Sequence, residues 1–243
     1  MKKPAALRKF LNIFYQRIFL NIVYKNLMRR KDFREDIINK FHMLFYRARL
    51  EGGTWKNMYW LGIHILKNPL DLWIFQEIIF NLKPDVIIET GTKYGGSALY
   101  LASLCDLINN GRIITIDIED QKGKPVHNRM EYLLGSSTSE LISDQVKKQI
   151  KNNEKVLVIL DSDHSKEHVL NELRIYSSLV SKGSYIIVED THLNGNPIDP
   201  LFGPGPMEAV HEFLKENKNF EIDYTKEKFY MTWNRNGYLK RIK

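Results

Sequence analysis

The chain has 243 residues, of which 43% are hydrophobic and 27% charged, so it can bury one sizeable core and is neither disordered nor collagen-like. Cys105 is the single cysteine, which excludes an internal disulfide and favours a reducing, cytoplasmic location. The net charge of +7 suggests an acidic partner, such as an anionic lipid, a nucleic acid or a phosphorylated substrate.

The first fifty residues are basic and rich in apolar and aromatic side chains. This composition predicts a basic amphipathic helical segment at residues 1–54, followed by the main domain at residues 55–243. Arg8, Lys9 and Arg17 interrupt every apolar run, so neither a signal peptide nor a membrane-spanning helix is expected. The helix could lie on the inner face of an anionic membrane, or it could pack on the domain or on a second subunit of a homo-oligomer. A nucleic-acid partner is not expected, because no recognisable module for it is present.

From residue 69 onwards, predicted helices alternate with β-branched strands. Helices are predicted over residues 69–82, 98–108, 139–151, 166–180 and 207–217, and strands over 86–88, 113–116, 132–134, 156–160 and 185–188. This alternation indicates a parallel, doubly wound α/β sheet. Residues 191–206 are too rich in proline and glycine for a regular element, and further strands are predicted at 221–224, 229–233 and 238–239.

Acidic residues end four of the predicted strands. They are Glu89, Asp117, Asp161 and the pair Glu189 and Asp190. In an open α/β sheet, ligands bind outside the carboxyl ends of the strands, near the point where the strand order reverses. We therefore expect these carboxylates to lie along one functional edge of the sheet.

The loop after the first of these strands is rich in glycine, which lets a ligand approach the backbone closely. It fits neither the dinucleotide fingerprint nor the phosphate-binding loop, and its leading acid would repel a pyrophosphate. A carboxylate at this place suits cationic amino or sulfonium groups, and Asp117 can accept hydrogen bonds from a ribose. The pattern predicts S-adenosylmethionine (SAM), unless the glycines merely form a turn. The candidate contacts in the loop are Glu89, Gly91, Thr92, Gly95 and Ser97.

A second polar cluster follows the strands that end at residues 160 and 188. Its acids are Asp161, Asp163, Glu189 and Asp190. Neighbouring parallel strands lie roughly 5 Å apart, so these carboxylates can converge on a hard cation, for which Mg²⁺ is the natural candidate. His164 or Lys166 could then remove a proton from a hydroxyl held by the metal. The alternative is a solvated acidic rim.

Several motifs resemble the cephalosporin hydroxylase family, which includes rhamnosyl O-methyltransferases, and they occur in order over residues 55–243. They include Lys67-Asn-Pro-Leu-Asp71, Glu89-Thr-Gly-Thr-Lys-Tyr-Gly-Gly-Ser97, Leu160-Asp-Ser-Asp-His-Ser165, Val188-Glu-Asp-Thr191 and Gly203-Pro-Gly-Pro206. Despite its name, that family has the fold of SAM-dependent methyltransferases. The resemblance implies a Rossmann-like class I fold: a mostly parallel seven-stranded sheet, helices on both faces and an antiparallel C-terminal hairpin.

The resemblance also implies roles for single residues of the cofactor site. Glu89 and Gly91 would line the methionine end of SAM, Asp117 the ribose, and Ser136 and Ser137 the adenine side. An aromatic residue is expected in the family at the position of Met207, so the acceptor pocket differs here.

The implied metal ligands are Asp163, Glu189 and Asp190, and Asp161, otherwise expected on the cofactor side, could replace Asp163. Catechol O-methyltransferases suggest a lysine base, whereas macrolide-sugar relatives suggest a histidine.

The sequence therefore predicts a magnesium- and SAM-dependent O-methyltransferase. Its acceptor would be a small molecule or glycan, with the methyl group placed on a sugar hydroxyl of a glycolipid, polysaccharide or natural product. One alternative is a metal-dependent hydroxylase, which would need redox-active iron, commonly held by two histidines and a carboxylate. The other is a non-catalytic membrane-associated protein that uses the N-terminal helices.

Overall fold

The computed structural model describes residues 5–47 and 54–243 of the chain. The chain forms two compact units, Met1–His42 and Met43–Lys243. The division falls inside helix α2 (Lys31–Arg47), which follows helix α1 (Ala5–Arg29). The predicted domain boundary at residues 54–55 adjoins residues 48–53, which lie outside the described residues.

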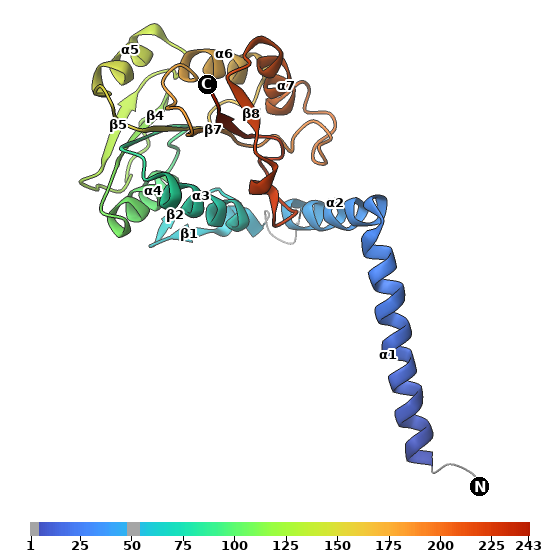
Figure 1. Cartoon of the computed structure of the whole chain (residues 1–243). Coiled ribbons are helices and arrows are strands. Elements are labelled where there is room, and N and C mark those ends of the chain that lie inside the picture. The colour runs from blue at the N-terminus through green and yellow to red at the C-terminus, as the bar shows by residue number, and fades with distance from the viewer. Residues whose placement is uncertain (1–4, 48–53) are drawn as a thin grey trace. The chain divides into compact units, whose positions relative to one another are not determined.

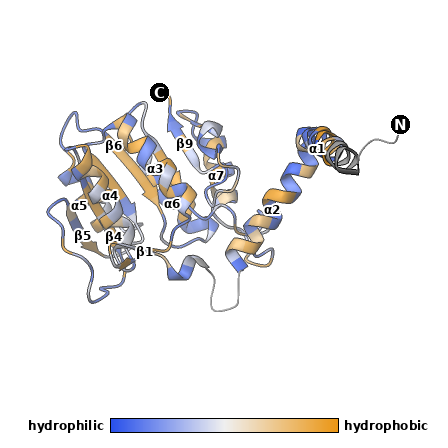
Figure 2. Ribbon diagram, turned by 90° about the horizontal axis from the view of Figure 1, so that it is seen from below, coloured by the Kyte–Doolittle hydropathy of each residue, from blue (hydrophilic) through white to orange (hydrophobic). Residues whose placement is uncertain are grey.

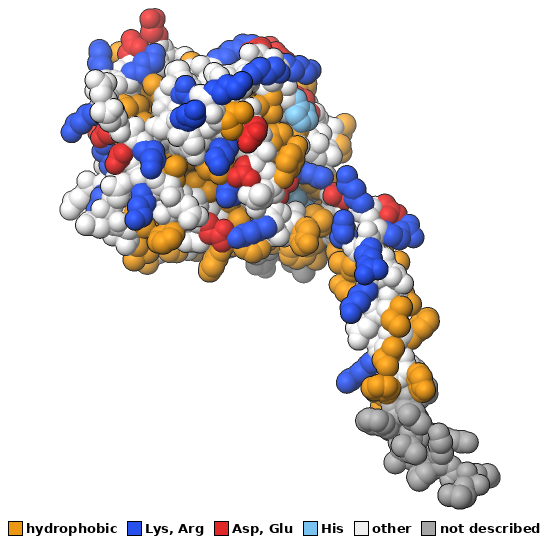
Figure 3. Space-filling view, viewed as in Figure 1, with side chains coloured by type: hydrophobic (Ala, Val, Ile, Leu, Met, Phe, Trp, Pro, Cys, Tyr) orange, Lys and Arg blue, Asp and Glu red, His pale blue; other side chains and the backbone are white. Residues whose placement is uncertain are grey.

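The helices of the first unit carry apolar side chains beside basic ones (Figure 3). Phe14, Phe19 and Leu20 of α1 are 51%, 66% and 63% exposed. Among the described residues, no helix combines the length and the hydropathy that a membrane crossing requires. The single chain thus leaves apolar surface on α1 uncovered.

The second unit is built on a seven-stranded sheet with the order β5-β4-β3-β6-β7-β9-β8 (Figure 1). The strands are β3 (Val86–Thr90), β4 (Arg112–Asp117), β5 (Met130–Leu134), β6 (Val156–Leu160), β7 (Tyr185–Val188), β8 (Phe220–Ile222) and β9 (Tyr238–Arg241). The first five are parallel, whereas β9 runs antiparallel to both β7 and β8. The predicted mostly parallel sheet with an antiparallel C-terminal hairpin is confirmed.

Helices cover both faces of the sheet, which explains why the central strands are continuously apolar (Figure 2). One core cluster joins the sheet to α3 (Pro69–Leu82) and α4 (Gly96–Leu107). The opposite cluster joins it to α5 (Glu140–Gln149), α6 (Lys166–Tyr176) and α7 (Pro206–Glu216). Cys105 lies in the α4 core, where burial raises the pKa of its thiol to about 11. A small hairpin of β1 (Tyr59–Trp60) and β2 (Ile63–His64) follows the 3₁₀ turn Thr54–Asn57.

One predicted strand is wrong, because residues 229–233 form no strand. The predicted strand at 221–224 is confirmed only in part, since β8 covers Phe220–Ile222 and the 3₁₀ turn Tyr224–Glu227 follows. Asp223 ends the strand, because its Oδ1 caps that turn by accepting the Thr225 N–H at 3.1 Å. Within this segment, the backbone N–H of Trp233 instead donates to the buried carboxylate of Asp71 at 2.8 Å, as described below. Residues 191–206 form no helix or strand, as expected.

The strand register aligns the carboxyl ends of β3, β4, β6 and β7, where the predicted acidic residues stand. Thr90 at the end of β3 is paired with Ile116 on β4 and with Leu160 on β6, and Leu160 is paired with Val188 on β7. The strand order reverses at β3, between β4 and β6. This is the place where open α/β sheets bind their ligands.

Candidate functional site

A cavity of about 570 Å³ opens at the carboxyl ends of β3, β4 and β6. The glycine loop, the end of β4 and the loop after β6 line one part of it. Residues from α2, from the segment before α3 and from the loop after β7 line the remainder. Both predicted clusters therefore face a single cavity.

The glycine loop runs so close to β6 that a side chain has no room at its start. Gly91 has a φ of +87°, and a Cβ there would lie 1.8 Å from the carbonyl oxygen of Asp161. Gly95, with a φ of +79°, is the N-terminal cap of α4, and a Cβ there would lie 2.8 Å from Pro125 Cδ. Glycine is required at both positions by backbone conformation and by space.

Glu89 is completely buried beneath this loop. Its Oε2 accepts the Thr115 hydroxyl at 2.7 Å, and Thr115 lies 2.7 Å from the hydroxyl of Thr92. Glu89 Oε1 and the buried Ser97 hydroxyl form no hydrogen bond of good geometry within the described part of the chain. Burial raises the pKa of Glu89, while the charge of Lys67 acts in the opposite direction. A buried carboxylate oxygen with spare capacity suits a cationic ligand group.

The remaining predicted cofactor residues lie further along the same edge. Asp117 is fixed by two backbone N–H groups, with Lys93 N at 2.7 Å and Glu119 N at 2.9 Å. Ser137 lines the cavity and donates its hydroxyl to Glu172 at 2.5 Å, whereas Ser136 bonds locally and is absent from the lining.

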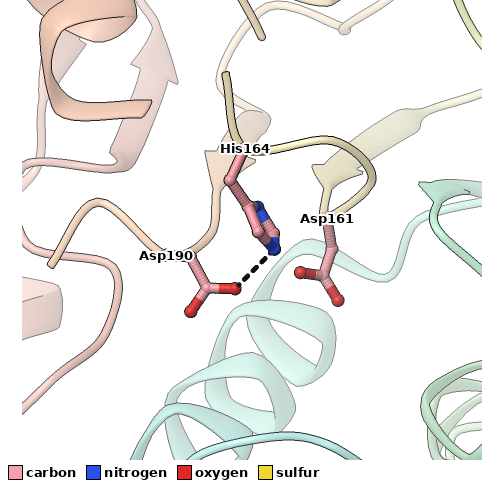
Figure 4. A group of neighbouring side chains, drawn as sticks. All are labelled: Asp161, His164 and Asp190. Atoms are coloured by element: carbon pink, nitrogen blue, oxygen red, sulfur yellow. Dashed lines mark ion pairs between the residues drawn. The ribbon is translucent and has the colours of Figure 1, made fainter. Parts of the chain in front are cut away.

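The acidic cluster centres on Asp161, His164 and Asp190, whose ligand atoms all lie within 4.8 Å of one another (Figure 4). His164 Nε2 is 3.2 Å from Asp190 Oδ2, and His192 Nε2 is 3.2 Å from Asp190 Oδ1. Burial acts to raise the pKa of Asp190, but the two histidines outweigh it and hold the pKa well below its usual range. Burial raises the pKa of Asp161, against the attraction of Lys67.

Three other predicted residues of the acidic cluster lie differently. Glu189 is buried, and its Oε1 accepts Lys67 Nζ at 2.6 Å. Asp163 is exposed, and its Oδ1 accepts the Ser165 N–H at 2.7 Å just before α6. Lys166 pairs with Glu212 of α7 at 2.5 Å and does not line the cavity.

Lys67 is a site residue to which sequence reasoning assigned no role. It is only 2% exposed, and its Nζ contacts Asp161 as well as Glu189. It precedes Asn68, which caps α3 by accepting the Leu70 N–H at 3.1 Å. In the sequence, Lys67 stands two residues before Pro69, which begins an apolar helix. A lysine at such a position is usually solvated, so the sequence alone does not indicate that Lys67 is buried.

Asp71 of α3 is a second residue with an unforeseen role. Its buried carboxylate accepts hydrogen bonds from Thr232 Oγ1 at 2.5 Å, Trp233 N at 2.8 Å and Tyr238 Oη at 2.9 Å. These bonds occupy the segment that was predicted to be a strand. They also place the Trp233 side chain in the cavity lining.

An aromatic group lines the far part of the cavity and was not foreseen at all. Tyr46 stacks on Trp55 with ring centroids 5.5 Å apart, and both pack edge-on to Trp233 at 5.9 and 5.7 Å. His192 contacts Tyr46 and Trp233, each at 5.1 Å. We call Tyr46, Trp55 and Trp233 the aromatic wall.

The sheet order, the glycine loop over the buried strand-end acid Glu89 and the acidic cluster beside this loop define a class I SAM-dependent methyltransferase. The sequence model of the Rhamnosyl O-methyltransferase/CmcI family matches residues 52–242. The chain belongs to this family, which confirms the resemblance seen in the sequence and the expected O-methyltransferase activity.

Curated relatives and solved structures agree with this family. The chain is 35% identical over 214 residues to a rhamnosyl O-methyltransferase of Mycobacterium leprae, covering 85% of this chain and 91% of that relative. It is 37% identical over 213 residues to a rhamnosyl O-methyltransferase of Mycobacterium tuberculosis, covering 84% and 85%. A CmcI structure with Mg and SAM has a TM-score of 0.61, and a CmcI apo structure 0.63, each 18% identical with 80% of both chains covered. The structural likeness shows the shared fold.

Proposed function

We propose that the chain uses Mg²⁺ and SAM to methylate a sugar hydroxyl in a glycolipid, polysaccharide or natural product. The supporting observation is that one cavity contains both the glycine loop with Asp117 and the cluster of Asp161, His164 and Asp190. The relatives named rhamnosyl O-methyltransferases favour a sugar acceptor, and the CmcI structure with Mg and SAM favours this metal.

The cofactor end of the cavity fits the groups of SAM. Glu89 Oε1 and the Ser97 hydroxyl, both buried with spare hydrogen-bonding capacity, would receive the ammonium group of the methionine end. Asp117 already holds two backbone N–H groups, and its remaining lone pairs would accept ribose hydroxyls. Ser137 would border the adenine. The methyl group is thereby directed from the glycine loop towards the acidic cluster.

The acidic cluster fits a hard divalent cation. Asp161 and Asp190 would bind it directly, whereas Glu189, the third predicted carboxylate, holds Lys67 and lies outside the group that could hold an ion. We prefer Asp161 to Asp163, because Asp161 belongs to the group with His164 and Asp190, whereas Asp163 Oδ1 accepts the Ser165 N–H. When bound, Mg²⁺ would lower the pKa of the acceptor hydroxyl and help to orient it.

We assign His164 as the general base. Its Nε2 would take the proton of the acceptor hydroxyl, and Asp190, 3.2 Å away, would stabilise the imidazolium that results. Lys166 is the less suitable base, since Glu212 holds its ammonium group outside the cavity lining. The remaining residues of the site serve to align the acceptor oxygen with the methyl group.

The donor set argues against an iron-dependent hydroxylase. Within the described residues, the group able to hold an ion contains one histidine and two carboxylates, instead of two histidines and one carboxylate. A non-catalytic role does not explain why the glycine loop, Asp117 and the acidic cluster line one cavity.

Calorimetry and turnover test the proposal. SAM should bind with or without Mg²⁺, whereas methyl transfer to methyl α-L-rhamnopyranoside should stop in EDTA and return with added Mg²⁺. His164→Ala should lose roughly 10²–10⁴-fold in turnover, while Lys166→Ala should lose little. Absence of SAM binding would contradict the proposed function, and full turnover in EDTA would contradict the metal.

A further inference from the structure

We propose that Tyr46 of α2 completes the acceptor site, and that the aromatic wall binds the apolar face of a neutral pyranose ring. This inference rests on the proposed function and adds one residue, Tyr46, that precedes the family match at residues 52–242. Tyr46 belongs to the second compact unit although it comes from a helix that begins in the first.

The position of the wall identifies the ligand that it would contact. Asp117 and Ser137 line the part of the cavity assigned to the cofactor, and Asp161 and Asp190 line its acidic part. His192 links Asp190 to the wall, because its Nε2 lies 3.2 Å from Asp190 and its ring contacts those of Tyr46 and Trp233. A molecule whose hydroxyl reaches the acidic cluster beside His192 would therefore lie against the wall.

Hydrogen bonds anchor the wall to several segments of the fold. The carbonyl of Trp233 accepts the Thr191 hydroxyl at 3.1 Å and the His192 N–H at 3.2 Å, and its N–H donates to Asp71. The indole N–H of Trp55 donates to the carbonyl of Tyr46 at 3.1 Å, which ties the two segments of the wall together. Fixed aromatic surface of this kind binds ligands at a low entropic cost.

The polar groups around the wall select the acceptor chemistry. Asp199 lines the cavity beside Tyr46, and Arg47, its ion-pair partner at 2.9 Å, is absent from the lining. Burial together with the charges of Asp199 and Asp190 raises the pKa of Tyr46 to about 12, so its hydroxyl stays a neutral donor. Carboxylates repel an anionic acceptor and accept hydrogen bonds from hydroxyls, while aromatic rings pack against C–H groups. A neutral pyranoside presents hydroxyls to the carboxylates and an apolar C–H face to the aromatic rings.

The test uses the full-length protein with S-adenosylhomocysteine and methyl α-L-rhamnopyranoside as the probe. Saturation-transfer NMR should show contact between protein rings and the sugar ring protons, and Tyr46→Ala should weaken probe binding about tenfold. Tyr46→Phe should retain most of the binding, since it keeps the ring. Leu44→Ala, an exposed position on the same helix, serves as the matched control and should bind like the unaltered chain.

The outcomes separate this inference from the proposed function. Failure to bind S-adenosylhomocysteine in calorimetry would refute the proposed function itself. Cofactor binding with unchanged probe affinity in Tyr46→Ala would refute the wall alone. Binding of 3,4-dihydroxybenzoate in preference to the pyranoside, or no binding of the pyranoside to the loaded protein, would overturn the sugar assignment.

Discussion

At the scale of single residues, Lys67 supplies the positive charge that makes the acidic edge of the sheet compatible with folding. Its ammonium group is buried between Asp161 and Glu189. Removal of one partner from a buried ion pair leaves uncompensated charge, whose cost is about 3–5 kcal/mol. The lysine thus balances the carboxylates in the absence of a cation.

Lys67→Met should therefore lower the free energy of unfolding by roughly 3–5 kcal/mol. Mg²⁺ should raise the melting temperature of this variant more than that of the unaltered chain, because the ion would replace the missing charge. Thermal unfolding with and without Mg²⁺ measures both effects. Lys93→Met, at a half-exposed position beside the same cavity, is the control, and equal melting temperatures for the two variants would contradict the role of Lys67.

His168 should make the stability of the folded chain depend on pH. The hydrogen bond to Glu172 raises the pKa of His168 above its usual value. A raised pKa in the folded state adds stability that is fully present below the unfolded value of about 6.5 and is lost as the pH rises through the folded value.

His168→Gln should accordingly cost more stability at pH 6 than at pH 8.5, with a difference of about 1 kcal/mol or less because the ring is partly solvated. Urea unfolding of both proteins at the two pH values measures the difference. A larger loss of stability at pH 8.5 than at pH 6 would contradict a raised pKa of His168 in the folded state.

The choice between Asp161 and Asp163 shows where sequence reasoning reaches its limit. Both aspartates follow β6 within three residues, and spacing alone cannot tell which one joins the group with His164 and Asp190. Both line the cavity, but Asp161 belongs to that group, whereas Asp163 Oδ1 accepts the N–H of Ser165 two residues on. A local bond of this kind between an aspartate and the following backbone is a preference that sequence spacing does not reveal.

At the scale of elements, the β3–α4 loop is the part that the sequence predicted best. Its glycines were expected to allow close approach to a ligand, and Gly91 also allows close approach to the backbone of β6. Two effects therefore require glycine at residue 91: the left-handed backbone conformation and the lack of space for a Cβ.

Gly91→Ala should destabilise the fold by roughly 3 kcal/mol or more, since a Cβ would overlap the Asp161 carbonyl and the backbone would be strained. Gly123→Ala is a matched control, because Gly123 has a φ of +81° with nothing within 4 Å of the added Cβ. It should cost only about 1 kcal/mol from backbone strain. Chemical denaturation compares the two, and equal losses would show that steric contact at Gly91 is unimportant.

The C-terminal part of the sheet was harder to predict for a physical reason. Residues 229–233 have the aromatic and β-branched character of a strand, but Asp71 on α3 takes the hydrogen bonds of residues 232 and 233. Such a tertiary bond between positions so far apart in the chain overrides local propensity. The alternating helices and strands between residues 69 and 188 carry no comparable conflict and were predicted correctly.

At the scale of the whole molecule, the exposed apolar side chains of α1 need a partner. Ile18, Phe19 and Leu20 are consecutive, and all three side chains are exposed. Successive residues of a helix are about 100° apart around its axis, so these side chains point in different directions and cover a wide part of the helix surface. Arg17 directly precedes this run, and Lys25 and Arg29 follow it in the same helix. We propose that this surface contacts an anionic membrane, with packing against a second subunit as the alternative.

A chain that lacks residues 1–42 should lose its binding to anionic vesicles, and added salt should weaken the binding of the intact chain. Binding of SAM should remain, because its site lies wholly within the second unit. Vesicle flotation and calorimetry measure the two properties. Loss of an oligomer in sedimentation, without any vesicle binding by the intact chain, would favour packing over the membrane.

The place of β9 in the sheet has a consequence for the order of events during synthesis. This strand is made after all its neighbours, yet it lies between β7 and β8 and brings Tyr238 to Asp71. A growing chain that ends before residue 231 has an open sheet edge at β7 and lacks Trp233. Contacts of such long range form slowly. The aromatic wall is therefore complete only after nearly the whole domain has been synthesised, and a chain that ends before residue 233 lacks one of its three rings.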